Sequence, residues 1–282
     1  MKKRKYLMSV MVIAVAASVS LIVFASFGQD KAGAGKEGYV GAETCEGCHP
    51  EVFAAFKKSP HREKECESCH GPGGKHAEEQ AKGSIFSFKD RTAASRSDAC
   101  LPCHQKQKEF FQFKRGAHRL GAVSCDDCHG IHGTKAAQHL LKKKEPDLCF
   151  SCHQEVRGQF SLPTRHKVLQ GAMKCSECHT PHGTQERASL KTWDRFNTDV
   201  CFKCHPEKRG PWVFEHSAVK VDGCGICHVP HGSPNRFLLR TRDVRRTCIQ
   251  CHGQHHFNTP QQSCVNCHTQ IHGSNFSSRF FQ

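Results

Sequence analysis

The sequence predicts a coil-rich chain of short α-helices with almost no β-structure, organised as an elongated array of five similar modules. Three observations predict this fold class. All 20 cysteines of the 282 residues fall into ten Cys-x-x-Cys-His motifs, the motifs recur in pairs about every fifty residues, and Gly and Pro interrupt the chain between them. A short repeat whose units mainly contact their neighbours favours an extended array over a globule.

The ten motifs carry the strongest chemical signal in the chain. Cys-x-x-Cys-His is the attachment signal of c-type haem, in which both thiols form thioethers with the haem and the histidine ligates its iron. The sequence therefore predicts a multihaem cytochrome c fold built around ten covalently bound haem c groups. The predicted attachment residues are Cys45, Cys48, Cys66, Cys69, Cys100, Cys103, Cys125, Cys128, Cys149, Cys152, Cys175, Cys178, Cys201, Cys204, Cys224, Cys227, Cys248, Cys251, Cys264 and Cys267. The predicted proximal iron ligands are His49, His70, His104, His129, His153, His179, His205, His228, His252 and His268.

Three other uses of paired cysteines fit less well. A zinc ribbon holds its metal with four thiolates and needs no histidine directly behind each pair. A thioredoxin-like redox motif occurs once, beside a βαβ pattern. A disulfide scaffold has no reason to repeat one spacing ten times.

The motif pairs divide the chain into five predicted two-haem modules, at residues 45–99, 100–148, 149–200, 201–247 and 248–282. Residues 1–28 read as a signal peptide, with the basic start "MKKRKY", an apolar stretch and small residues near Ala25 and Gly28. The apolar stretch is also long enough for a retained membrane anchor. Residues 29–44 read as a flexible leader.

Each module also holds two histidines outside its motifs. The upstream set precedes the second motif of each module and comprises His61, His118, His166, His216 and His256, with His255 as the alternative to His256. The downstream set follows the second motif and comprises His76, His132, His182, His231 and His272. Ten additional histidines for ten haems predict bis-histidine ligation throughout, with these residues as distal ligands. Met173 is the only methionine outside the predicted signal peptide, and His139 has no assigned role.

Chain length limits which haem each distal histidine can reach. Two histidines that ligate one iron from opposite faces have Cα atoms about 12–13 Å apart, whereas three residues span at most about 10–11 Å. His182 therefore cannot ligate the haem held by His179 and must reach a neighbouring haem. The upstream set is assigned to the second haem of each module and the downstream set to the first haem of the same module, because His255 and His256 follow His252 too closely to share its haem.

About 25 residues per haem leave little room for an ordinary apolar core, so the haems are expected to form it and the Phe side chains to pack on their edges. Helices are expected at 50–58 ("PEVFAAFKK") and 105–114 ("QKQKEFFQFK"). The formal net charge of +15 would raise nucleic acid as a partner. The propionates of ten haems offset most of this charge, so no nucleic-acid partner is predicted.

Two imidazoles on every iron leave no open coordination position for a substrate, so the pattern predicts electron transfer and no catalytic residue. Three functions remain open at this point. They are a conduit across a membrane inside a barrel-forming partner, a soluble periplasmic shuttle, and a multihaem reductase with one iron that lacks a distal ligand.

The strings "CHTPHG", "CHVPHG" and "FAAFKKSPH", with ten motifs in residues 39–282, resemble the MtrA/DmsE-type decahaem c-type cytochromes. The resemblance implies a bis-histidine haem wire that serves anaerobic respiration and extracellular electron transfer. It also implies an exported, periplasmic protein that enters an outer-membrane β-barrel porin-like partner and exchanges electrons with periplasmic and outer-surface redox cytochromes. The shortened fifth module ("CHGQHHFNTPQQSC") and the "GPGG" insertion before His76 depart from that pattern.

Overall fold

The structure, a computed structural model, describes residues 38–133, 138–192, 198–253 and 262–281. The predicted signal peptide, most of the predicted leader, and both His255 and His256 lie outside the described residues. No helix in these ranges is long and apolar enough to cross a bilayer.

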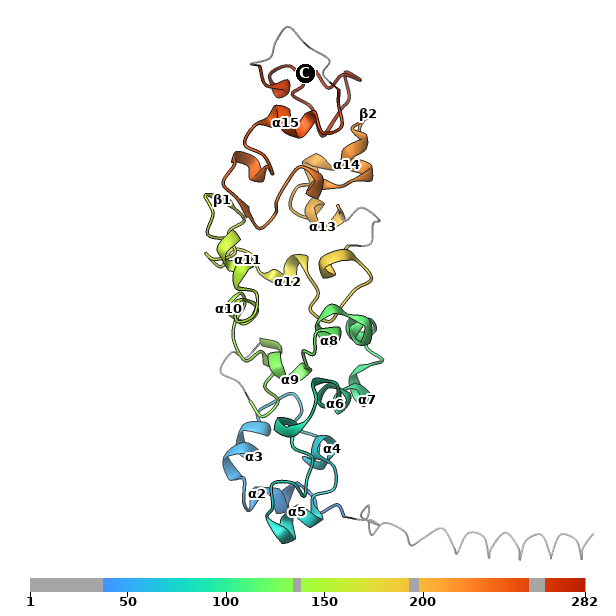
Figure 1. Cartoon of the computed structure of the whole chain (residues 1–282). Helices are drawn as coiled ribbons and strands as arrows, with labels where there is room; N and C mark the ends of the chain where they lie inside the picture. Colours follow the sequence, from blue (N-terminus) through green and yellow to red (C-terminus); the bar gives the residue numbers. More distant parts are fainter. Residues whose placement is uncertain (1–37, 134–137, 193–197, 254–261, 282) are drawn as a thin grey trace, which may run out of the picture. The chain divides into compact units, whose positions relative to one another are not determined.

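The described chain consists of short helices joined by coil, as Figure 1 shows. The longest α-helix has seven residues, so the predicted coil-rich fold with short helices is confirmed. The α-helices are α2 (Ala42–Glu46), α3 (Pro50–Phe56), α4 (Glu67–His70), α5 (Gly74–Glu79), α6 (Ala93–Asp98), α7 (Leu101–His104), α8 (Ala117–Leu120), α9 (Cys125–Cys128), α10 (Asp147–Phe150), α11 (Gln154–Gln159), α12 (Cys175–Cys178), α13 (Asp199–Phe202), α14 (Ser217–Val221) and α15 (Val244–Cys248). The 3₁₀ turns are η1 (Phe88–Asp90), η2 (Lys108–Phe110), η3 (Phe113–Arg115), η4 (Gln138–Leu140), η5 (Arg187–Ser189), η6 (Pro206–Lys208), η7 (Cys224–Ile226), η8 (Arg236–Leu238) and η9 (Cys264–Asn266).

The two predicted helices had different outcomes. α3 forms where expected and starts at Pro50, whose missing N–H is harmless in the first turn of a helix. The helix predicted at 105–114 is wrong, because the chain forms only η2 and η3 there. Gln107 has extended backbone (φ −75°, ψ 139°), which breaks the helical run. The phenylalanines also do not share one face, since Phe113 is buried and Phe111 is 77% exposed.

Residues 38–47 and 66–86 form one compact unit, and residues 48–65 and 87–281 form a second. The smaller unit is organised around the buried carboxylate of Glu67, which begins α4. This carboxylate accepts backbone N–H groups from Val40 (3.0 Å), Gly41 (2.9 Å) and Gly73 (2.7 Å). The five predicted modules follow the motifs instead of this division, and their boundaries stay a prediction.

The larger unit has few buried apolar side chains for its length. Its hydrophobic cluster consists of Phe150, Phe160 and Val168, with Met173 packed against it. In the described ranges the largest fully buried side chains are serines. The side chains themselves therefore supply little core, as a chain built around large cofactors requires.

The strands of the larger unit are two residues long and form two antiparallel pairs. β1 (Thr164–Arg165) pairs with β3 (Gly232–Ser233), and β2 (Phe214–Glu215) pairs with β4 (Gly273–Ser274). β1 directly precedes His166, and β3 directly follows His231. Likewise, β2 directly precedes His216, and β4 directly follows His272. Each strand pair therefore joins an upstream histidine to a downstream histidine of the next predicted module.

Candidate functional site

One helical turn shapes the Cys-x-x-Cys-His motifs. In the His129 motif the histidine N–H donates to the carbonyl of Cys125, four residues back, at 2.9 Å, and the His179 motif repeats this bond to Cys175. No two of the twenty cysteines are joined in a disulfide. The turn therefore gathers two thiols and one imidazole, as attachment to a single haem requires.

Motif histidines face histidines from outside the motifs in pairs. Seven motif histidines in the described ranges have a histidine ring whose centre lies 6.0–6.4 Å from their own. The pairs are His61–His104 (6.0 Å), His118–His153 (6.1 Å), His166–His205 (6.4 Å), His216–His252 (6.1 Å), His182–His129 (6.1 Å), His231–His179 (6.0 Å) and His272–His228 (6.3 Å).

This spacing suits a metal held between the two rings. An imidazole nitrogen lies about 2 Å from a metal that it ligates, and the ring centre lies about 1 Å behind that nitrogen, so two imidazoles on opposite sides of one metal have centres about 6 Å apart. Two imidazoles packed against each other without a metal would have no reason to keep one separation at seven places. The paired residues thus fit the iron of a bis-histidine haem.

The hydrogen bonds of the ring nitrogens also suit metal ligation. His129, His179 and His228 each place Nδ1 2.7–2.8 Å from a backbone carbonyl oxygen, that of His139, Ala188 and Phe237 respectively. A carbonyl oxygen can only accept, so Nδ1 carries the proton and donates it. This tautomer leaves the lone pair of Nε2 free for a metal, which is the usual state of a metal-ligating histidine.

Three of the predicted distal histidines show the same arrangement, and each is bonded to the loop that carries another. Nδ1 of His118 donates to the carbonyl of Pro181 at 2.9 Å, immediately before His182. The bonds from His166 to Pro230 (2.6 Å) and from His216 to Ile271 (2.8 Å) repeat it, immediately before the next downstream histidine. Two distal histidines of successive modules are therefore held together at each of these junctions.

Burial keeps three of the downstream imidazoles neutral. It lowers the pKa of His182 and of His272 to about 4, and it lowers the pKa of His231 as well. Phe110 packs on the His182 ring at 4.4 Å between ring centres, and Phe160 packs on His231 at 5.1 Å. A neutral imidazole is the form that binds a metal.

The ring pairs correct the assignment expected from chain length. Upstream histidines face the first motif of the following module, not the second motif of their own, as His118 does with His153. Downstream histidines face the second motif of the preceding module, not the first motif of their own, as His182 does with His129. The physical reason is that the strand pairs and the Nδ1 hydrogen bonds hold an upstream histidine beside a downstream histidine of the next module. Both side chains therefore face motifs across the module boundary. The sequence predicted that His182 lies against a motif other than that of His179, and its ring contact with His129 agrees with this.

Glycine follows four of the five downstream histidines and permits this close crossing. A Cβ on Gly183, which has φ +95°, would lie 2.8 Å from the Cα of Gly116. A Cβ on Gly232 would strike the carbonyl of Gln159, and one on Gly273 would strike the ring of Trp212. The His-Gly dipeptide of the repeat therefore marks backbone contact with the preceding module.

Thiols of different motifs also lie together. Within four predicted modules the first thiols of the two motifs lie close to each other, at Cys45–Cys66, Cys100–Cys125, Cys149–Cys175 and Cys248–Cys264. Cys149, Cys175 and the carboxylate of Glu145 have ligand atoms within 4.8 Å of one another. They make a poor metal site, because a structural zinc takes four ligands and Glu145 already accepts the N–H of Ser176 at 2.8 Å.

Sequence reasoning missed the carbonyl acceptors of the motif histidines. His139, left without a role, supplies its backbone carbonyl, and it has left-handed backbone (φ 54°), as do Ala188 and Phe237 at the equivalent places. The available signal was a Leu-Lys or Leu-Arg dipeptide behind each of these motifs, at Leu141–Lys142, Leu190–Lys191 and Leu239–Arg240. The backbone N–H groups of Lys142, Lys191 and Arg240 donate to the carbonyl of the second cysteine in the motif that precedes each of them. This hydrogen bond closes the loop.

Other predicted ligands make contacts of other kinds. His76 donates to the carbonyl of Ala81 at 3.0 Å, and the ring of His132 lies 6.5 Å from that of Phe56. Their role as distal ligands, and that of His49, His70 and His268 as proximal ligands, stays a prediction.

Comparison with known proteins agrees with this geometry. Residues 118–158, 166–210 and 216–257 match the family described as "Doubled CXXCH motif", and residues 44–130 match "Cytochrome c554 and c-prime". The chain is similar to the protein named multiheme cytochrome MtrA of Shewanella baltica (strain OS185), with 34% identity over 194 residues. That stretch is 64% of this chain and 57% of the relative, so the chain spans less than two thirds of the relative's length. The motifs and these matches indicate covalent haem c, with its iron, as the cofactor.

Proposed function

We propose that this chain, a multihaem c-type cytochrome, carries ten haems and conducts electrons along them as a wire. The observation that carries the proposal is the set of seven histidine pairs with ring centres 6.0–6.4 Å apart. Each pair would hold one haem iron between two imidazoles. The remaining three motifs would take His76, His132 and one of His255 and His256 as distal ligands.

The residues also support contact between successive haems. The first thiols of paired motifs touch within a module, and Cys128 and Cys178 lie close to Cys152 and Cys204 of the next module. Thioether bonds at these cysteines would bring neighbouring haem edges together on both sides. Electrons could then pass from haem to haem without leaving the chain.

The protein is proposed to be an electron carrier and not an enzyme. Reduction of a substrate at haem needs an open iron position, and a histidine pair that held the iron on both sides would leave none. The chain's own residues would hold each iron low-spin, fix the tautomer of imidazoles such as those of His118 and His129 through the carbonyl bonds, and keep water from buried ligands such as His182.

We further propose that the protein is exported and works at the outer membrane within a β-barrel partner, where it passes electrons between periplasmic and outer-surface cytochromes. The basic start and apolar stretch of residues 1–28 support export. The likeness to the Shewanella multiheme cytochrome and the "CHTPHG" and "CHVPHG" strings support this place of action. A soluble periplasmic shuttle is the alternative.

Fractionation tests the proposed place of action. The native protein is isolated from outer membranes with mild detergent through a C-terminal tag, and the proteins that co-purify are identified. An outer-membrane barrel in stoichiometric amount is the expected result. Complete recovery of haem-loaded protein in the periplasmic wash, with no barrel attached, would favour the shuttle.

A further inference from the structure

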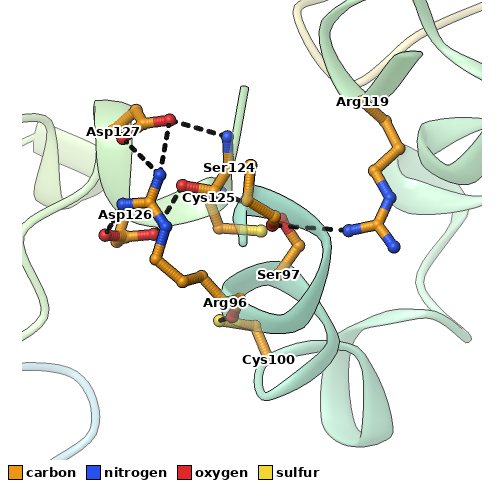
Figure 2. A network of polar contacts seen from close by, with 9 residues as sticks. Arg96, Ser97, Cys100, Arg119, Ser124, Cys125, Asp126 and Asp127 are labelled. Atoms are coloured by element: carbon orange, nitrogen blue, oxygen red, sulfur yellow. Dashed lines mark hydrogen bonds and ion pairs between the residues drawn. The ribbon is translucent and has the colours of Figure 1, made fainter. Parts of the chain in front are cut away.

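A half-buried ion-pair network lies against one predicted haem-attachment motif. Figure 2 shows Arg96, from α6, reaching across to the two acidic residues inside the Cys-Asp-Asp-Cys-His motif on α9. Its guanidinium is 2.7 Å from an oxygen of Asp126 and 3.1 Å from an oxygen of Asp127. Only 20% of the Arg96 side chain and 24% of the Asp126 side chain are exposed. These charges therefore interact with less solvent screening than surface charges do.

The network is more than α9 needs to form. Ser124 and the carboxylates of the motif already cap the helix without Arg96, because the Ser124 N–H donates to Asp127 at 2.8 Å and its hydroxyl donates to Asp126 at 2.6 Å. The buried hydroxyl of Ser97 lies 3.4 Å from the N–H of Cys125 and supports the same turn. Arg96 consequently adds a positive charge to a turn that other groups already shape.

The motif is also unlike the other nine. None of them has two acidic residues between its cysteines. Two carboxylates beside a haem stabilise the ferric iron over the ferrous iron, because reduction removes one positive charge from the haem. A guanidinium held against those carboxylates offsets part of this effect. Charge and hydrogen bonding around the cofactor are among the levers that set a haem potential.

We propose that Arg96, with Asp126 and Asp127, sets the reduction potential of the haem carried by Cys125 and Cys128. The inference rests on the proposed haem wire, but not on the compartment or partner in which the wire works. Arg96 acts by holding a positive charge against the carboxylates of Asp126 and Asp127, whose negative charge it partly offsets.

The test is a potentiometric titration of the purified, haem-loaded chain, followed by its visible absorption. Arg96→Gln leaves two uncompensated carboxylates, so one haem component should move to a lower midpoint potential while the rest of the curve stays in place. Asp126→Asn leaves Arg96 opposite a single carboxylate, so the same component should move to a higher potential. Arg96→Lys keeps the charge and should stay closer to the unchanged chain than Arg96→Gln does.

Lys220→Gln is the matched control. It removes one positive charge from an exposed ion pair with Glu215 (2.8 Å) and should leave the component unmoved. Equal shifts in one direction for Arg96→Gln and Asp126→Asn, or no shift in either, would overturn the proposal. Loss of one haem per chain from Arg96→Gln with no shift in Asp126→Asn would also overturn it, in favour of a structural role. The titration contains no barrel partner. Its result therefore does not depend on whether the protein works inside a barrel or as a soluble shuttle.

Discussion

The ring of His118 faces the ring of His153 at 6.1 Å between centres, although the two residues belong to different predicted modules. The Nδ1 bond from His118 to Pro181 then ties the first ring to the loop that carries His182, which faces His129. The predicted haem sites at His153 and at His129 therefore both depend on the hydrogen bond between His118 and Pro181. The predictions below follow from this arrangement.

Replacing His118 with Ala should open one iron position at the haem of Cys149 and Cys152. The expected result is binding of about one carbon monoxide per reduced chain, with a matching high-spin signal in the oxidised protein. To identify the haem, the Cys149→Ser/Cys152→Ser change is added to the same variant, and carbon monoxide binding should disappear. If it disappears instead when Cys125 and Cys128 are replaced, the cross-module assignment is wrong.

Gly183→Ala should destabilise the protein, because its φ of +95° is unfavourable for alanine and the new Cβ would lie 2.8 Å from Gly116 Cα. Strain of this kind costs about 1–3 kcal/mol. Gly158→Ala is the control, since Gly158 lies within α11 with open space around it, and alanine should stabilise that helix by about 0.5–1 kcal/mol. Thermal unfolding of the haem-loaded proteins should shift in opposite directions, and equal shifts would argue against the close crossing.

The smaller unit should lose stability in acid through Glu67. Burial opposes the charge of this carboxylate, but the N–H groups of Gly73, Gly41 and Val40 outweigh it and lower its pKa in the folded state. A lowered folded pKa adds stability above the unfolded pKa of about 4.3, and this contribution is lost as the pH falls toward the folded pKa.

Unfolding measured between neutral pH and about pH 3 should therefore show a decline that Glu67→Gln flattens. The amide accepts weaker hydrogen bonds, so this variant should also be less stable at neutral pH by about 1–3 kcal/mol. The titratable side chain beside Glu67 is Cys45, which haem attachment would convert to a thioether. Equal acid sensitivity in both proteins would exclude Glu67 as the cause.

His139→Ala should leave every haem low-spin, because His139 acts through its backbone carbonyl and not through its ring. His139→Pro is the contrasting variant, since proline cannot adopt the φ of 54° found at this position. The Pro change should disturb the bond to His129 Nδ1 and the absorption spectrum. A new high-spin signal in His139→Ala would identify its ring as an iron ligand.

The sequence could predict the chemistry of the sites but not their connections. The spacing of each motif suffices for haem attachment, because a single turn fixes Cys125, Cys128 and His129 together. The short span of three residues excluded the haem of His179 as the one that His182 ligates. It could not decide which neighbouring motif His182 faces instead. That choice depends on β-pairs of two residues each and on backbone carbonyls such as that of Pro181, neither of which leaves a periodic pattern. The 105–114 segment failed for a related reason, since its apolar residues look helical until extended Gln107 interrupts them.

Electron paramagnetic resonance of the oxidised, haem-loaded protein tests the central claim, two imidazoles on every iron, most directly. The account predicts low-spin ferric signals only, ten haems per chain by haem quantification, and no carbon monoxide binding after reduction. A high-spin signal equal to one haem per chain, from an iron that also binds carbon monoxide or nitrite at neutral pH, would contradict it and identify a catalytic centre.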